Sequence, residues 1–181
     1  MRNNFKVYNI LIMICTLTFF SIIAIASDTN NVGFKGMLVS RPCQLETGSE
    51  NLEVNFGETA EKYFYTNIRT AGKSLVIKLV KCDVNTQKSV RVKFTGQESN
   101  QLPGLLIVTD KTISTGLAIG IETDDGTAIA INKSGPLKEI NMVENAIHVK
   151  AYLQGEPEAV TKRKVTLGEF TVSAGFELEY E

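Results

Sequence analysis

Cysteine and histidine are the side chains of this sequence with the widest chemical use, and they are few: Cys15, Cys43, Cys82 and His148. No CxxC or HxxxH spacing is present, and so few ligands cannot close a zinc shell without carboxylates. The sequence also contains no GxSxG, no HExxH and no phosphate loop. We therefore expect no catalytic residue, no metal site and no cofactor. His148 shares a predicted strand face with Lys150, so we expect it to face solvent rather than act as a general base.

The chain opens with the pattern of a secretory signal peptide. Arg2 and Lys6 precede an uncharged apolar stretch, 10–26, which ends in Ala-Ile-Ala, a small-x-small cleavage site. An uncleaved membrane anchor is the alternative, but the stretch is shorter than the roughly 20 residues of a spanning helix. Cys15 lies inside the apolar run rather than at its end, so lipidation is not expected. We expect residues 1–26 to be removed and the exported protein to begin at Ser27.

Export leaves two cysteines, Cys43 and Cys82. A pair in an exported chain is most simply a disulfide, which would close a loop of about 40 residues and restrict the unfolded chain by roughly 4 kcal/mol. Two unpaired buried thiols are the alternative.

The composition predicts a folded domain with no general affinity for nucleic acid. Lys and Arg total 19 against 20 Asp and Glu, which gives a net charge of −1 and no basic excess. Hydrophobic residues make up 43% of the chain and charged residues 22%, enough apolar side chains for a core. We find no internal repeat or linker and expect one domain after the signal peptide.

Alternation of apolar and polar residues dominates the chain after the signal peptide. It predicts strands over 75–80, 90–95, 117–131 and 147–153, with a hairpin turn at Asp124-Asp125-Gly126. The 75–80 strand is apolar on both faces and is expected to be covered on both. No window longer than two turns keeps a helical period with caps. The pattern favours an all-β antiparallel sandwich of immunoglobulin-like size.

Two strands near the ends of the exported chain are unusually apolar on one face. The last segment places on one face Phe170, Val172, Ala174, Phe176, Leu178 and Tyr180. A segment ahead of Cys43 has a similar spacing in Val32, Phe34, Gly36 and Leu38. Either strand could pair inside its own domain, because a closed sandwich also needs a first and a last strand.

The chain resembles the subunits of chaperone–usher pili over nearly its whole exported length. The collinear motifs are Phe34-x-Gly36-x-Leu38, Arg41-Pro42-Cys43, Val54-x-Phe56-Gly57, Ile77-x-Leu79-x-x-x-Cys82, Val92-x-Phe94-x-Gly96, Leu102-Pro103-Gly104, Gly120-Ile121, Gly168-x-Phe170-x-Val172-x-Ala174 and Phe176-x-Leu178-x-Tyr180. Among such subunits it is most similar to the minor adaptor of P-type pili, through Leu38-x-x-Arg41-Pro42-Cys43, the Leu-Pro-Gly stretch and Glu156-Pro157-Glu158-Ala159.

The resemblance implies an incomplete immunoglobulin-like sandwich that lacks its last strand and is completed by a donor strand in trans. A periplasmic chaperone would supply that strand first, and at the outer-membrane usher the N-terminal extension of a neighbouring subunit would replace it. Carried onto this chain, residues 27–40 are the donor extension, with Val32, Phe34, Gly36 and Leu38 as its groove-facing residues, and 41–181 is the pilin domain. The implied location is the cell-surface fimbrium, reached through the periplasm, with no nucleic acid or small-molecule substrate as partner.

The acceptor side would be the last strand, and its residues would bind the chaperone. The groove residues implied are Phe170, Val172, Ala174, Phe176, Leu178 and Tyr180, and basic chaperone residues would hold the carboxylate of Glu181. Gly175 departs from the pattern, in which alanine or threonine is expected before Phe176.

The function implied is therefore a structural adaptor subunit that polymerises by donor-strand exchange and helps mount the tip adhesin for attachment to host cells. A tip adhesin itself would need an additional receptor-binding domain, for which the chain is too short. A free-standing secreted immunoglobulin-like binding module is the main alternative, and it would be monomeric and soluble when expressed alone.

Overall fold

The computed structural model describes residues 42–85, 87–110 and 113–181. The predicted signal peptide, its cleavage point and the predicted donor residues Val32, Phe34, Gly36 and Leu38 lie outside these ranges. Their assignments stay predictions.

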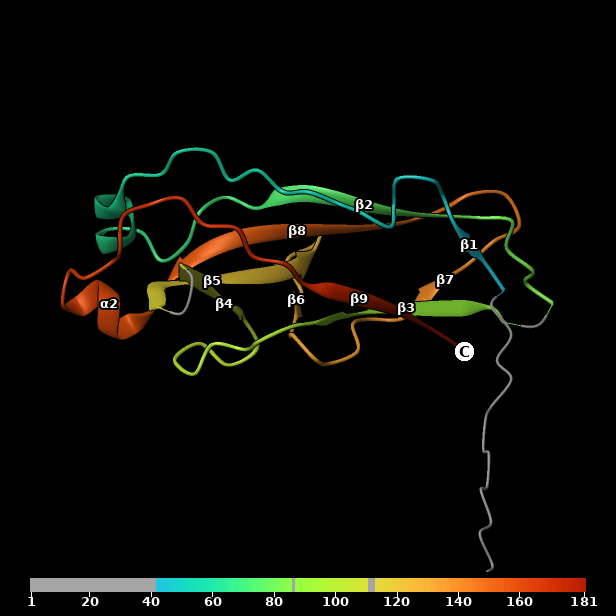
Figure 1. The fold of residues 1–181 in the computed structure, drawn as a ribbon. Helices are drawn as coiled ribbons and strands as arrows, with labels where there is room; N and C mark the ends of the chain where they lie inside the picture. The colour runs from blue at the N-terminus through green and yellow to red at the C-terminus, as the bar shows by residue number, and fades with distance from the viewer. Residues whose placement is uncertain (1–41, 86, 111–112) are drawn as a thin grey trace, which may run out of the picture. The chain divides into compact units, whose positions relative to one another are not determined.

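Nine strands and two short helices make up the described part of the chain (Figure 1). In chain order they are β1 (Gln44–Leu45), the 3-10 helix η1 (Glu61–Tyr65), β2 (Lys73–Val80), β3 (Ser89–Thr95), β4 (Leu106–Asp110), β5 (Ile113–Thr123), β6 (Ala128–Ile129), β7 (Lys138–Glu139), β8 (Asn145–Gly155), the α-helix α2 (Pro157–Thr161) and β9 (Gly175–Tyr180).

The strands form two antiparallel sheets within the described residues. The larger has the order β1-β2-β8-β5-β4, with β6 paired to β5, and the smaller has the order β7-β3-β9. In Figure 1, β3 and β9 lie below β2 and β8, and η1 and α2 lie at the end of the domain opposite β1. Among the described residues, no helix is long and apolar enough to cross a membrane. The predicted all-β sandwich is confirmed.

Alternation in the sequence places the core between the sheets. Ile77 and Leu79 of β2 and Val90 of β3 are fully buried and belong to one apolar cluster with Val149 of β8. Because successive side chains of a strand point to opposite faces, each apolar series buries one face. The predicted strands near 90–95 and 147–153 are thus confirmed. The 75–80 strand differs in part, since Val76 is only half-buried on its outer face.

The predicted hairpin is formed by β5 and β6, in which Ile121 lies opposite Ile129. Its turn contains Gly126 with a φ of +88°, a conformation that favours glycine. The Asp125 carboxylate accepts hydrogen bonds from the Thr123 hydroxyl and from the Thr127 amide. Both hydrogen bonds lower the pKa of Asp125 below its ordinary value, and the bond from Thr123 has the larger effect. Local turn chemistry therefore suffices to define this connection.

A disulfide joins Cys43 to Cys82, 39 residues apart in sequence, as predicted. It lies where β1 pairs with the end of β2, with Gln44 opposite Val80. The first short strand of the described chain is thus covalently attached to the larger sheet.

Candidate functional site

The two sheets end in strands that have a partner on one side only within the described chain. β9 is the end strand of the smaller sheet and pairs with β3, from Val90 opposite Tyr180 to Thr95 opposite Gly175. β1 is the end strand of the larger sheet. An end strand presents main-chain N–H and C=O groups that can pair with a further strand. Within the described residues, the side of β9 away from β3 therefore has no strand beside it.

The predicted groove residues lie in β9 and in the segment that precedes it. Phe170, Val172, Phe176, Leu178 and Tyr180 are half-buried and pack against the core. Ala174, the sixth residue predicted for this face, is exposed. Of the intervening residues, Thr171, Ser173, Gly175 and Glu177 are exposed and Glu179 is half-buried, so the predicted alternation holds except at Ala174 and Glu179. The structure thus brings five of the six side chains against the core, each with part of its surface uncovered.

The predicted strand is longer than the strand observed. A continuous strand was expected over 170–180, whereas β9 begins at Gly175. Its partner β3 ends at Thr95, opposite Gly175, and no described strand lies opposite 170–174. Residues 170–174 therefore keep the alternating pattern of a strand but have no ladder within the described chain.

A second apolar series, which the groove prediction did not include, lies in the segment after β1. Val54 and Phe56 are half-buried and pack against the core. Leu45 and Leu52 are 38% and 36% exposed. The rings of Phe56 and Phe170 are 6.4 Å apart between centroids, which places this segment next to the start of the groove series. The Val54-x-Phe56 alternation in the sequence was the signal for this second wall.

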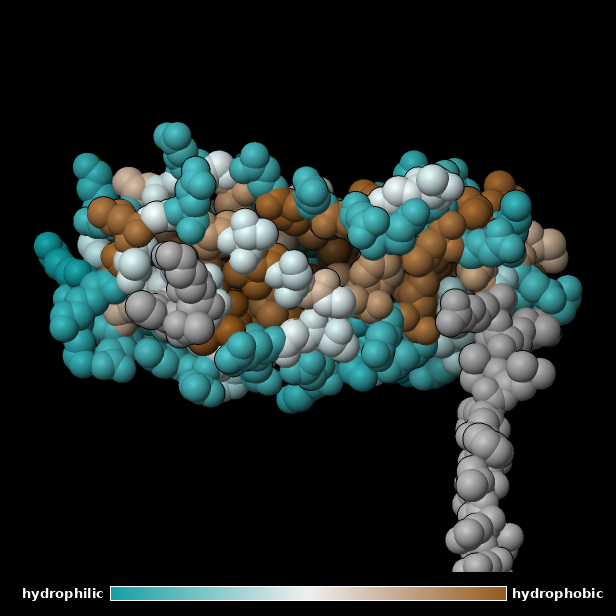
Figure 2. Space-filling view, in the orientation of Figure 1, coloured by the Kyte–Doolittle hydropathy of each residue, from teal (hydrophilic) through white to brown (hydrophobic). Residues whose placement is uncertain are grey.

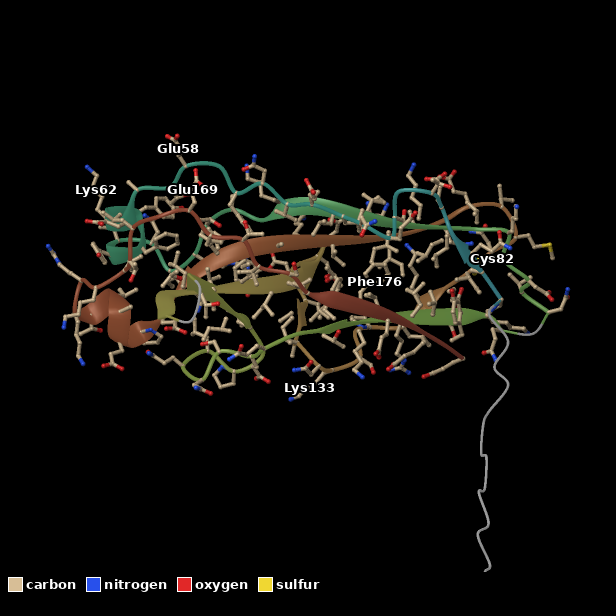
Figure 3. All side chains as sticks on the ribbon, viewed as in Figure 1. Glu58, Lys62, Cys82, Lys133, Glu169 and Phe176 are labelled. Atoms are coloured by element: carbon tan, nitrogen blue, oxygen red, sulfur yellow. A yellow bond between two sulfur atoms is a disulfide. The ribbon has the colours of Figure 1, made fainter. Side chains whose placement is uncertain are left out.

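Space-filling colours show the same feature on one face of the domain (Figure 2). Hydrophobic side chains form a band along the middle of this face, and hydrophilic side chains border it above and below. In Figure 3, Phe176 is labelled beside β9, near the middle of the domain. An apolar band of this kind on a monomer marks an interaction site.

Charged side chains occupy the opposite face of β9. Lys93 pairs at 3.3 Å with Glu177, the residue directly opposite it in the β3–β9 ladder. Arg91 pairs at 2.9 Å with the side-chain carboxylate of Glu181, which follows β9. Opposite charges in directly facing positions stabilise an antiparallel pair. On this face Glu177 is exposed and Arg91 and Lys93 are half-buried, whereas the apolar side chains of β9 pack against the core.

Glu181 is held by its own domain. Its main-chain oxygen accepts hydrogen bonds from the amides of Lys88 and Ser89, at 3.0 and 3.1 Å, and from the Ser89 hydroxyl at 3.1 Å. The predicted contact with basic residues of a chaperone stays a prediction, and these internal hydrogen bonds would compete with it.

The structure explains why glycine, rather than the expected alanine or threonine, stands at position 175. A Cβ atom at this position would lie 2.7 Å from the hydroxyl oxygen of Thr95, the residue opposite it in the ladder. Glycine therefore fits beside Thr95, where the alanine expected from the pattern would force that side chain to move.

The sequence prediction for metal ligands and for His148 also concerns the described part of the chain. Within 42–85, 87–110 and 113–181, no group of three or more His, Cys, Asp or Glu residues could hold a metal ion. His148 is exposed, as predicted, and its Nδ1 lies 3.9 Å from a carboxylate oxygen of Asp124. What the geometry supports is strand binding.

Comparisons with known proteins agree with this geometry. The family model described as fimbrial protein matches residues 32–181. The chain is 33% identical over 153 residues to the uncharacterized fimbrial-like protein YfcP of Escherichia coli K12, covering 83% of each chain. It is 32% identical over 164 residues to the fimbrial adapter PapK of Escherichia coli, covering 87% of this chain and 89% of that one.

Solved structures agree on the fold. The crystal structure of the P pilus rod subunit PapA superposes with a TM-score of 0.68 at 24% identity, covering 78% of this chain and all of that one. The predicted fold class, an incomplete immunoglobulin-like sandwich, is confirmed by this likeness.

Proposed function

The chain belongs to the fimbrial protein family of chaperone–usher pilus subunits, and on that premise we propose that it is a minor adaptor subunit that helps mount a tip adhesin. Subunits of this family are exported through the periplasm to the cell-surface fimbrium. Their partners are the chaperone, the usher and neighbouring subunits. The family consists of structural subunits rather than enzymes.

The observation that carries the proposal is the half-buried apolar series in and before β9, a strand whose one strand partner among residues 42–85, 87–110 and 113–181 is β3. A donor strand laid along β9, on the side away from β3, would form main-chain hydrogen bonds with it and would place alternate side chains between the two walls. Such an edge is an aggregation hazard until it is covered. A dedicated chaperone removes that hazard during export.

The donor side of the proposal rests on residues 27–40. Val32, Phe34 and Leu38 would enter the groove of a neighbouring subunit, and each should contribute about 1.5–3 kcal/mol before ordering costs. Gly36 would lie where a wall of that groove approaches closely. The same groove-and-extension arrangement would let this chain accept one neighbour and donate to another, as an adaptor must.

Similarity to a fimbrial adapter supports the adaptor role, because 87% of this chain aligns with it. A free-standing secreted binding module is no longer needed to explain the fold, since the family is one of fibre subunits.

Strand exchange tests the proposal directly. The chain is co-expressed with its chaperone, and the purified complex is incubated with peptides of the N-terminal extensions of candidate subunits; we expect one of them to displace the chaperone. A complex of the adhesin with its chaperone is likewise incubated with a peptide of residues 27–40. Uptake by the adhesin supports the adaptor role. Uptake only by another subunit would contradict that role and leave a fimbrial subunit of a different position.

A further inference from the structure

The loop between β7 and β8 presents two apolar side chains to solvent. Met142 is 68% exposed and Val143 is 86% exposed. Single exposed apolar residues are common on protein surfaces, but two adjacent ones on an ordered loop call for an explanation.

Side-chain amides hold this loop in one conformation. The Asn141 side-chain oxygen accepts hydrogen bonds from the amides of Val143 and Glu144, at 2.9 and 3.2 Å. The Asn145 side chain accepts from the Asn141 amide at 2.8 Å and donates to the Asn141 carbonyl at 2.7 Å. Asn145 itself is only 4% exposed. Because the backbone is already ordered, a partner that buried Met142 and Val143 would lose little conformational entropy in doing so.

The loop lies at the end of the domain where the described chain begins, at Pro42. The Asn145 side chain donates to the Cys82 sulfur at 3.3 Å, and Cys82 is bonded to Cys43. The Asp83 amide donates to the Pro42 carbonyl at 2.7 Å. Cys82 is labelled at this end in Figure 3, whereas η1 lies at the other end in Figure 1.

Chain length brings a neighbouring subunit to the same end. If Leu38 is the last extension residue in a neighbour's groove, only residues 39–41 separate it from Pro42. At about 3.6 Å per residue, the neighbour then lies within roughly 14 Å of Pro42. The Asn141–Asn145 loop is connected to Pro42 through the disulfide and two hydrogen bonds, so it lies at the end of the domain that is nearest to that neighbour.

We propose that Met142 and Val143 form an apolar contact with the neighbouring fimbrial subunit that receives residues 27–40. The inference rests on the proposed function and adds a second contact to donor-strand insertion. Methionine is enriched at protein interfaces, and its unbranched side chain adapts to an irregular surface. The contact would restrict bending between two subunits otherwise joined by three residues of extended chain.

Methionine oxidation measures the contact. After the predicted cleavage at Ser27 the chain retains two methionines, Met37 and Met142. Hydrogen peroxide converts exposed methionine to the sulfoxide, which mass spectrometry locates. Two samples are compared. In the first, this chain is bound to its chaperone. In the second, residues 27–40 of the same complex have also entered the groove of an acceptor subunit, chosen because it takes up the peptide of these residues. We expect Met142 to oxidise several-fold more slowly in the second sample.

Substitution provides the matched comparison. Met142→Ser with Val143→Ser should lower the thermal dissociation midpoint of the assembled complex. Ile68→Ser should leave it unchanged, because Ile68 is 81% exposed but follows η1 at the other end of the domain. Both variants should unfold normally as chaperone complexes, since the side chains replaced are exposed.

The outcomes separate this inference from the proposed function. Equal oxidation of Met142 in the two samples, or equal midpoints for the double variant and Ile68→Ser, would overturn the loop contact while donor-strand insertion stands. Failure of every candidate subunit to accept residues 27–40 would instead overturn the proposed function, and the loop contact with it.

Discussion

Cys43 and Cys82 attach β1 to the end of β2, and Asn145 reaches the Cys82 sulfur from β8. The bridge could be predicted because export leaves only these two cysteines. The hydrogen bond from Asn145 could not, since no sequence spacing relates residues 63 positions apart. At the scale of single residues, a disulfide can be predicted where only two cysteines are available. A hydrogen bond between side chains that only the fold brings together cannot.

Removing the disulfide should destabilise the domain by about 2–5 kcal/mol, because the unfolded chain regains the freedom of the closed loop. Cys43→Ser, Cys82→Ser and the double variant should all lose about the same free energy of unfolding. Urea denaturation of each oxidised protein, saturated with the same donor peptide, measures the difference from the wild-type protein. Two titratable thiols in the native wild-type protein would contradict this prediction.

Gly120 is expected to tolerate no side chain, because a Cβ atom there would lie 2.2 Å from the ring of Tyr152. The Arg69 guanidinium lies over this ring, 4.1 Å from its centroid. Arg69 also pairs with Glu122 at 2.5 Å, and this hydrogen bond raises the pKa of Arg69. Gly120→Ala should therefore cost about 1–3 kcal/mol of stability by overpacking.

A double-mutant cycle checks the physical reason. In a Tyr152→Ala background the obstacle is gone, and Gly120→Ala should then change the denaturation midpoint little. The same loss in both backgrounds would show that the backbone of β5, rather than the ring, excludes a side chain.

At the scale of elements, alternation predicts which face of a strand is apolar but does not predict its partner. Five of the six apolar residues predicted between Phe170 and Tyr180 pack against the core and Ala174 does not, and the ladder begins only at Gly175, opposite the last residue of β3. Val54 and Phe56 were visible as a motif, but their place beside Phe170 depends on how the segment after β1 runs along the sandwich. Which distant segments lie side by side depends on the tertiary fold, and the alternation within one segment does not predict it.

Phe176 is the element-scale test of the groove. Phe176→Asp places a carboxylate among apolar side chains and should abolish recovery of the chaperone complex, because an unpaired buried charge is costly. Ser173→Asp is the matched control, since it adds the same carboxylate on the exposed face of the segment before β9. Pull-down from periplasmic extracts compares the two.

The ring of Phe176 also contacts the core, with centroids 6.4 Å from Phe94, so a conservative variant is needed. Phe176→Leu keeps an apolar side chain and should retain the complex. Equal recovery of the Phe176→Asp and Ser173→Asp complexes would contradict the assignment of this face to donor-strand binding.

At the scale of the whole molecule, the family could be predicted because its motifs recur in order along the chain, each tied to a local need such as a turn or a buried strand. What the motifs could not predict was the presentation of Met142 and Val143, whose loop is held by asparagine side chains on both sides of it. Surface features of this kind depend on the particular subunit, whereas the core depends on the shared fold.

The open sandwich predicts that stability depends on the concentration of a donor strand. A ligand that binds only the folded chain adds RT ln(1 + [L]/Kd), which is about 2.7 kcal/mol at a hundredfold excess over Kd. The exported chain alone should therefore aggregate and unfold at low denaturant, and its midpoint should rise with added peptide of a neighbour's extension. Size-exclusion chromatography and urea titration at several peptide concentrations measure both. A soluble monomer with a midpoint that no donor peptide shifts would mean that the sandwich closes on itself, with the chain's own N-terminal strand beside β9.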